Sequence, residues 1–313
     1  VATEESNEAP EGMVANELTG EWIDESLSNQ RPLTCMINNL KPAMPQSGIG
    51  QADIVYEMLV EGGITRLMGV YKDYSKLEKL GPIRSSRHYY VEEAMEYDAI
   101  YAHVGQSVFA EEKIASTGIN NINGLYNSMI FRDKSRVAPH NAYTNSENIA
   151  AAIKEQKYRT EYDTTFSKDK FVFAKDDTEL ADGEKAEKIT TAFNSNRKPW
   201  FEYDSENKVY KRFQYGDKQI DAETDEQLTY KNVIIQFCPH APLLEELIDI
   251  TLTGEGTGYY ATDGKVIPIT WKKSGDGDTC KYYTEDGKQL EMNVGKTWIT
   301  IFPDDQKGDI TFE

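Results

Sequence analysis

The last third of the chain consists of short segments in which apolar and polar residues alternate, separated by turn residues. The turns Ser205-Glu206-Asn207, Asp263-Gly264 and Asp286-Gly287 stand between such segments. Alternation with a period of two, interrupted by Asp-Gly or Asn-containing turns, is typical of β-hairpins. We therefore predict a mainly antiparallel β unit after Trp200. Its strands are expected at residues 200–203, 208–214, 230–238, 247–253, 257–261, 265–271, 279–283 and 297–302.

The first half of the chain mixes strand and helix signals. Residues 33–37 form an apolar run of strand length, and residues 53–71 alternate on both sides of Glu61-Gly62-Gly63, which predicts a hairpin. A further strand is expected at 98–104. Helical spacing predicts helices at 86–96, 109–115 and 146–156.

Polar residues mark where two of these helices should begin. Ser85 or Ser86 could cap the first helix, and Thr144 with Glu147 fits a capping box for the last. The whole pattern predicts an α+β fold in which a mixed N-terminal α/β unit packs on the β unit as a layered sandwich. The expected divisions are a flexible acidic tether at 1–30, an N-terminal domain at 31–160, a crossover at 161–199 and a C-terminal domain at 200–313.

Charge limits the classes of partner. The chain has 34 Lys and Arg against 53 Asp and Glu, a formal net charge of −19. Binding of nucleic acid needs a basic face, and docking on an anionic bilayer needs basic segments, so we expect neither. The acidic tether and the start at Val1 rather than Met suggest that a leader has been removed, although a trimmed cytosolic protein would look the same.

The cysteines are few and far apart. Cys35, Cys238 and Cys280 do not have the spacing of a disulfide scaffold or a zinc site. One bridge between Cys238 and Cys280 is an alternative to three free thiols.

The segment Gly81-Pro82-Ile83-Arg84-Ser85-Ser86-Arg87-His88 is out of character in so acidic a chain. It places two guanidiniums, two hydroxyls and an imidazole just before a predicted helix, whose first N–H groups would add positive potential. Arginine offers a planar fork that suits carboxylate or phosphate. We therefore predict a cleft that binds an anionic small molecule or a cell-envelope protein. Its expected ligand-binding residues are Arg66, Arg84, Ser85, Arg87, His103, Arg132 and His140.

Other interpretations of the same residues remain open. The arginines could instead form internal salt bridges, with Asp53, Glu57, Glu61, Asp98 and Asp133 as the available carboxylates. The same cleft could support a hydrolase or transferase with Ser85, Ser86 or Ser107 as nucleophile, His103 or His140 as base and Asp98 or Glu61 as the orienting acid.

A metal site and a nucleotide site are not expected. His88, His103 and His140 lack the spacing of helical zinc motifs, and Gly254-Glu255-Gly256-Thr257-Gly258 has no following helix or Lys-Ser/Thr pair. The sequence therefore indicates no metal and no cofactor. A third class of function is a protein-interaction module that presents the aromatic β unit to a partner.

Several long stretches resemble the YerB-like putative lipoprotein family of Gram-positive bacteria. The resemblance covers about residues 18–303. The stretches that carry it include Ile37-Asn38-Asn39, Gln51-Ala52-Asp53-Ile54-Val55-Tyr56-Glu57, Val60-Glu61-Gly62-Gly63-Ile64-Thr65-Arg66, Gly81-Pro82-Ile83-Arg84-Ser85-Ser86-Arg87, Ala138-Pro139-His140-Asn141 and Gly295-Lys296-Thr297-Trp298.

The resemblance implies a location more than a reaction. It implies a lipid-anchored protein on the extracellular side of the cytoplasmic membrane, with no established biochemical function and no catalytic residues to transfer. The chain shows no lipobox cysteine. The expected contact with the membrane is thus only through an N-terminal lipid anchor absent from this chain.

Overall fold

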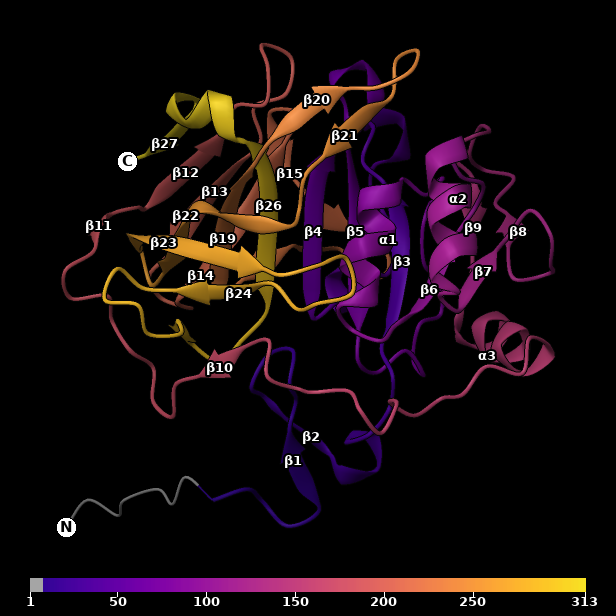
Figure 1. The fold of residues 1–313 in the computed structure, drawn as a ribbon, viewed down its shortest axis with the longest axis horizontal. Helices are drawn as coiled ribbons and strands as arrows, with labels where there is room; N and C mark the ends of the chain where they lie inside the picture. The colour runs from indigo at the N-terminus through magenta and orange to yellow at the C-terminus, as the bar shows by residue number, and fades with distance from the viewer. Residues whose placement is uncertain (1–7) are drawn as a thin grey trace.

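One continuous sheet of 11 strands runs through both halves of the chain in the computed structural model, which describes residues 8–313 (Figure 1). In spatial order its strands are β11 (Glu184–Lys185), β23 (Lys265–Lys273), β22 (Gly254–Thr262), β19 (Asn232–Cys238), β26 (Thr297–Pro303), β4 (Ile54–Leu59), β5 (Thr65–Tyr71), β3 (Leu33–Asn38), β6 (Ile100–His103) and β7 (Asn121–Asn123), with β24 (Lys281–Tyr283) paired to β23.

The two halves join where β26 pairs with β4. This pairing is parallel, with Trp298 opposite Val55, and β26 also pairs in parallel with β19. The first half of the chain and the last therefore contribute to the same sheet and do not form separate sheets. The C-terminal half is mainly antiparallel, as predicted, because β19, β22, β23 and β24 form an antiparallel meander.

A second, six-stranded sheet covers one face of the large sheet. Its strands are β15 (Asp217–Lys218), β14 (Val209–Gln214), β13 (Trp200–Asp204), β12 (Lys188–Thr191) and β27 (Ile310–Phe312), with β18 (Thr229–Tyr230) paired to β14. Between the two sheets, Val55 and Trp298 of the large sheet pack with Phe201 and Tyr210 of the small one.

Helices complete the layers. Helix α1 (His88–Met95) buries Tyr90 and Val91 against the opposite face of the large sheet, in the same core as Met58 and Met68. Helix α2 (Val108–Thr117) lies beside α1 (Figure 1), and α3 (Ser146–Glu155) packs on the face that carries the second sheet. This arrangement confirms the predicted α+β layered fold.

Short elements connect and flank these layers. The remaining strands are β1 (Met13–Ala15), β2 (Trp22–Asp24), β8 (Phe131–Arg132), β9 (Ala142–Tyr143), β10 (Val172–Phe173), β16 (Ile220–Asp221), β17 (Glu226–Gln227), β20 (His240–Pro242), β21 (Ile248–Ile250) and β25 (Glu291–Met292). The 3₁₀ helices are η1 (Glu25–Leu27), η2 (Lys41–Ala43), η3 (Ile49–Gln51), η4 (Glu61–Gly63) and η5 (Asp304–Asp309). Among residues 8–313, no helix is long and apolar enough to cross a membrane.

The prediction of a flexible tether is wrong for residues 13–27. Strands β1 and β2 form a hairpin, and the segment between them docks on the body of the protein. Leu18 is buried in the core, the side-chain amide of Asn16 donates to Asp53 at 3.1 Å, and Glu17 pairs with Lys72 at 2.5 Å. The acidic composition gave no indication that the Asn16 amide and the Glu17 carboxylate bind the body of the protein and fix this segment. Residues 1–7 of the predicted tether lie outside the described part of the chain.

Two predicted helix caps are also corrected. Helix α3 is capped by the side chain of Asn145, which accepts from the N–H of Asn148 at 2.8 Å, because the Thr144 hydroxyl donates to the carbonyl of Met129. Helix α1 begins after Arg87, and no side chain caps it. The predicted hairpin at residues 53–71 is present as β4 and β5, and all three cysteines are free, buried thiols.

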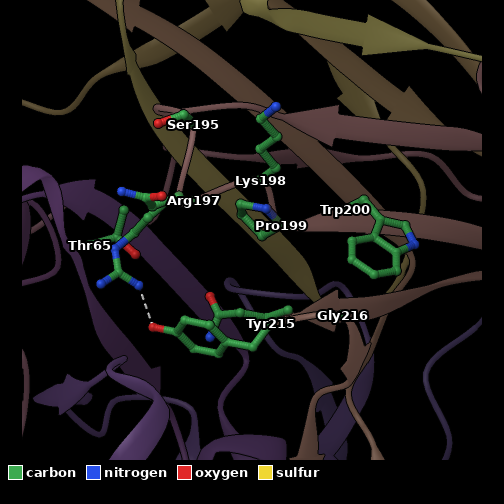
Figure 2. Close-up of a pocket in the computed structure, with 10 residues that line it drawn as sticks. Thr65, Ser195, Arg197, Lys198, Pro199, Trp200, Tyr215 and Gly216 are labelled. Atoms are coloured by element: carbon green, nitrogen blue, oxygen red, sulfur yellow. Dashed lines mark hydrogen bonds between the residues drawn. The ribbon is translucent and has the colours of Figure 1, made fainter.

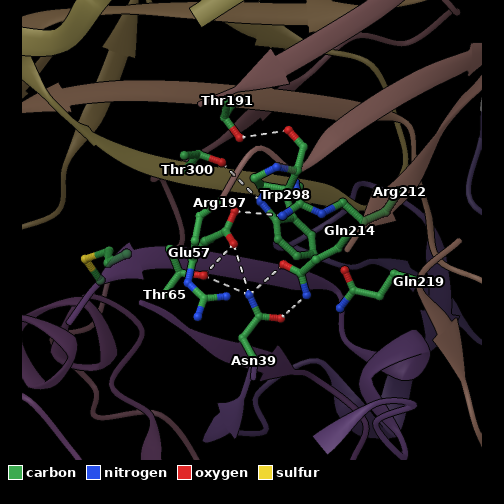
Figure 3. Close-up of polar contacts among 12 residues, drawn as sticks. Asn39, Glu57, Thr65, Thr191, Arg197, Arg212, Gln214, Gln219, Trp298 and Thr300 are labelled. Atoms are coloured by element: carbon green, nitrogen blue, oxygen red, sulfur yellow. Dashed lines mark hydrogen bonds and ion pairs between the residues drawn. The ribbon is translucent and has the colours of Figure 1, made fainter. Parts of the chain in front are cut away.

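A buried ion pair joins the two sheets (Figure 3). The carboxylate of Glu57 on β4 accepts from the Arg212 guanidinium of β14 at 2.8 Å, and both side chains are fully buried. Glu57 also accepts from Thr65 at 2.9 Å and from Asn39 at 3.1 Å. The Arg212 guanidinium lies over the ring of Trp298, 4.2 Å from its centroid, so an aromatic face supports the part of the charge that Glu57 does not reach.

Removing the acid from this pair is expected to destabilise the fold strongly. Glu57→Gln leaves the Arg212 charge buried without a counter-ion, which costs about 3–5 kcal/mol of unfolding free energy. Urea denaturation monitored by circular dichroism measures the loss. The double variant Glu57→Gln/Arg212→Met should recover much of it, because no buried charge then remains.

The matched control is Glu187→Gln, which removes one partner of the exposed pair Lys185–Glu187. It should change the unfolding free energy by less than about 1 kcal/mol. If Glu57→Gln were no more damaging than Glu187→Gln, the ion pair would not hold the layers together.

Candidate functional site

The predicted site lies at the carboxyl ends of three parallel strands. Strands β3, β6 and β7 run in the same direction, with α1 between β3 and β6 and α2 between β6 and β7 along the chain. The strands end at Asn38, His103 and Asn123, and both helices begin at this edge. In open α/β sheets, ligands bind at the carboxyl ends of the strands, where helix N-termini also collect.

The cationic segment 81–88 fills the gap between the ends of β3 and β6. The backbone N–H of Arg84 donates to Met36 of β3, and its carbonyl accepts from Val104, just after β6. Gly81 is required before it, because φ is +145° and a Cβ atom there would lie 2.8 Å from the carbonyl oxygen of Ala142. The backbone thus fixes Arg84 and Ser85 at the edge.

Neither predicted serine cap forms, because both hydroxyls are used elsewhere. The Ser85 hydroxyl donates to the carbonyl of Val104 at 3.1 Å. The Ser86 hydroxyl is buried and accepts from Tyr101 at 2.6 Å. Ser107, one of the proposed nucleophiles, caps helix α2.

Three arginines gather around this segment, but they are not equivalent. Arg66 is buried and donates to the carbonyl of Ser85 at 2.8 Å. Arg87 forms a two-point ion pair with Glu61, with its Nε 2.9 Å from Oε2. Burial, together with the charges of Arg87 and Arg84, lowers the pKa of Arg66 to about 10. The single carboxylate of Glu61 is therefore surrounded by the positive charges of three arginines, Arg66, Arg84 and Arg87.

Arg84 is the arginine that is left available. Its guanidinium is half-buried, and within residues 8–313 it makes no ion pair and no side-chain hydrogen bond. Burial lowers the pKa of Arg84, and the neighbouring charge of Arg87 lowers it further. A negatively charged group at this position would relieve both effects.

His140 lies beside Arg84. Its Nδ1 is 2.8 Å from the side-chain amide nitrogen of Asn38, whose amide oxygen in turn accepts from the N–H of Leu40. That second bond orients the Asn38 amide so that its NH₂ group faces the ring. Nδ1 is then an acceptor, and neutral His140 carries its hydrogen on Nε2. Burial and the positive charge of Arg84 lower the pKa of His140.

The other predicted site residues do not join this group. His103 is buried and stacked on Tyr101, with its two ring nitrogens 2.8 Å from the Gly105 carbonyl and 2.9 Å from the Asn121 amide oxygen. Burial lowers its pKa. Arg132 is exposed on β8 and donates to Asn141 at 3.0 Å. His103 is thus a structural residue of the edge, and Arg132 belongs to the loop beside it.

The proposed serine–histidine–acid arrangement is not assembled. Within the described residues, no hydrogen bond joins Ser85, Ser86 or Ser107 to a histidine. Asp98 is held by Arg159 at 2.5 Å, and Glu61 by Arg87. Residues 8–313 also contain no group of three His, Cys, Asp or Glu side chains placed to hold a metal ion.

Sequence reasoning missed a second site, a pocket of about 340 Å³ at the seam between the two halves (Figure 2). Thr65 of β5 lies on one side, and Arg197, Lys198 and Tyr215 come from the C-terminal half. Arg197 falls in the segment 161–199 that was expected to be only a crossover. The nearest signal was Tyr215-Gly216, a turn between two strands, which gave no indication of what the tyrosine contacts.

Comparison with known proteins places the chain in a family. Residues 18–159 match the N-terminal domain, and residues 189–299 the C-terminal domain, of the family described as "Protein of unknown function (DUF3048)". The chain belongs to this family. It is 31% identical over 291 residues to the protein named "Putative lipoprotein YerB" from Bacillus subtilis, which spans 92% of this chain and 86% of that protein.

A solved structure agrees with the fold. The crystal structure of YerB from Bacillus subtilis matches with a TM-score of 0.85 at 29% identity, and the match covers 96% of this chain and 99% of that one. The YerB-like resemblance found in the sequence is therefore confirmed across both halves.

The charge of Arg84 should control the titration of His140. In Arg84→Gln, the pKa of His140 should rise, because one of the two causes that lower it is removed while burial remains. An NMR titration of the imidazole Cε1–H signals measures the change. Arg132→Gln is the matched control and should leave the pKa of His140 in place. An unchanged pKa in Arg84→Gln would mean that the two side chains are not coupled.

Proposed function

We propose that this chain is the extracytoplasmic domain of a lipoprotein, tethered to the outer side of the cytoplasmic membrane. It binds an anionic ligand at the sheet edge formed by the carboxyl ends of β3, β6 and β7, which we call the Arg84 edge. The name of the relative supports the lipoprotein part of the proposal. The ligand is an anionic small molecule or an anionic group on a cell-envelope protein. No nucleic acid is involved, since the net charge is −19.

The observation that carries the binding site is the contrast among the three arginines. Arg87 is neutralised by Glu61 and Arg66 is committed to a carbonyl, whereas Arg84 is half-buried with its fork unoccupied. A guanidinium has five N–H donors in a fixed plane and binds carboxylate or phosphate oxygens in pairs. Arg66 and Arg87 supply positive potential behind it.

His140 and Ser85 complete the proposed site. Neutral His140 offers an Nε2–H donor and lies within the electrostatic influence of Arg84, which lowers its pKa. An anion bound between them would favour the charged imidazolium. The Ser85 hydroxyl lies at its margin, next to Arg84 in the chain. His103, which is buried with both nitrogens in use, acts behind the site by holding the ends of β6 and β7 in place.

Loss of the Arg84 fork should weaken anion binding. We expect wild-type protein to bind sulfate or phosphate in isothermal titration calorimetry, and Arg84→Gln to bind about 10- to 100-fold more weakly, the effect of one hydrogen-bonded charge contact. Bound sulfate should also raise the pKa of His140 in NMR titrations. Lys288→Gln removes one exposed positive charge elsewhere and should bind normally. Equal affinity of the Arg84 and Lys288 variants would contradict the proposed site.

The tether can be tested separately. The full-length protein expressed in its own host should partition into the detergent phase of a Triton X-114 extraction and be degraded by protease added to protoplasts. Both results follow from a lipid-anchored domain outside the cytoplasmic membrane. Protection from the protease, with a cytosolic enzyme as control, would place the domain on the other side.

A further inference from the structure

The seam pocket is a cationic cavity on the opposite face of the sheet from Arg84. Thr65 and Arg66 are neighbours on β5, so their side chains point to opposite faces. Arg66 faces the α1 side, and Thr65 faces the second sheet, where its hydroxyl donates to Glu57 and its residue lines the pocket. The two sites are thus separated by the sheet and can be tested independently.

Positive charge in this pocket is not neutralised. Arg197 and Lys198 line it, and no Asp or Glu is among the described residues of its wall. Neither cation forms an ion pair within residues 8–313. Beside these two cations the wall carries the short polar side chains of Ser195 and Asn196 and the apolar rings of Pro199 and Trp200. The chain as a whole has a net charge of −19, whereas this cavity is lined by two cations and no carboxylate among the described residues.

Tyr215 holds Arg197 in place at a conformational cost. Its backbone φ is +56°, a left-handed conformation that a bulky residue adopts rarely and that costs on the order of 1 kcal/mol. Gly216, with φ +78°, completes the turn between β14 and β15. This turn places the tyrosine in the seam, where its hydroxyl donates to the Asn39 carbonyl at 2.6 Å and accepts from Arg197 (Figure 2).

The floor of the pocket is rigid. Thr65 and Gln214 line it from below, and both belong to the network around the Glu57–Arg212 pair (Figure 3). The Gln214 amide exchanges two hydrogen bonds with the Asn39 amide, at 2.8 and 2.9 Å. The Gln214 amide oxygen, one of its two N–H donors and the Thr65 hydroxyl are thus occupied within the protein, so recognition falls mainly to Arg197, Lys198, Ser195 and Asn196 at the rim.

We infer that the seam pocket binds a small polar molecule that carries a carboxylate or phosphate, such as a sugar acid or a sugar phosphate. Arg197 binds the oxyanion with the donors that Tyr215 leaves free, and Lys198 adds a second charge. Ser195 and Asn196 meet hydroxyl groups, and Pro199 packs against the ring. A volume of about 340 Å³ suits a ligand of one sugar ring. Tyr215 is a positioning residue.

Titration with matched sugars tests this inference. Wild-type protein is titrated with glucuronate, glucose 6-phosphate and neutral glucose, followed by the NMR signals of the Arg197 Nε–H and the Trp200 indole N–H. We expect one or both anionic sugars to bind and shift these signals, and glucose not to bind. Binding of only the carboxylate or only the phosphate identifies the oxyanion.

Variants separate this pocket from the Arg84 edge. Arg197→Gln should weaken binding about 10-fold or more, and Tyr215→Phe, which keeps the ring but leaves Arg197 without its hydroxyl partner, by a smaller factor. Arg84→Gln removes the other proposed anion site, so a sugar that still shifts the Arg197 and Trp200 signals in this variant is bound in the seam pocket. Lys288→Gln, which removes an exposed charge outside both sites, should bind these sugars normally. If Arg197→Gln does not fold, as judged by circular dichroism, Arg197→Lys keeps the charge without the fork and should still bind more weakly.

Three results would overturn the inference. The first is the absence of any shift with either anionic sugar at millimolar concentration. The second is equal binding of glucose and the anionic sugars. The third is full affinity in the folded Arg197 variant. Loss of binding in Arg84→Gln together with full affinity in Arg197→Gln would assign the sugar anion to the Arg84 edge instead.

Discussion

The buried pair of Glu57 and Arg212 determines how the two layers of this protein meet. Each charge would be costly to remove from water alone. The pair is tolerated because Asn39 and Thr65 donate hydrogen bonds to Glu57, and because the ring of Trp298 lies against the Arg212 guanidinium, whose Nε and Nη1 have no hydrogen-bond partner among the described residues. The two partners come from different sheets and are 155 residues apart in the chain. Correct docking of the second sheet is therefore required before either charge is compensated.

The same network shapes the seam pocket. Thr65 and Gln214 are at once members of the network and the floor of the cavity, so the geometry of the pocket depends on the docking of the sheets. Because the Thr65 hydroxyl and the Gln214 amide oxygen are already paired within the protein, a ligand is recognised mainly at the rim. Preorganisation of this kind lowers the entropy that binding would otherwise cost.

Local signals in the sequence predicted local structure well and long-range structure poorly. The hairpin at β4 and β5 and the strands after Trp200 were predicted because alternation and turn residues act over a few positions. The parallel pairing of β26 with β4 joins segments more than 230 residues apart and leaves no local pattern. The order of residues 13–27 was missed because it depends on contacts of Asn16 and Glu17 with Asp53 and Lys72, which flank β4 and β5.

The candidate sites show the same limit at the level of single side chains. Composition indicated that arginines gather near residue 84, but it could not distinguish Arg84, which is available, from Arg87, which Glu61 neutralises. That difference depends on the position of the turn before β5. Arg197 and Lys198 follow a run of short polar residues with no motif that indicates a site, and the left-handed turn at Tyr215 supplies the hydroxyl that Arg197 binds. In both sites the charge that remains unpaired is set by the tertiary fold, because the fold decides which carboxylates can reach which guanidiniums. An acidic chain can therefore hold two local cationic sites. At physiological ionic strength the Debye length is about 8 Å, so distant negative charges on the surface have little influence on them.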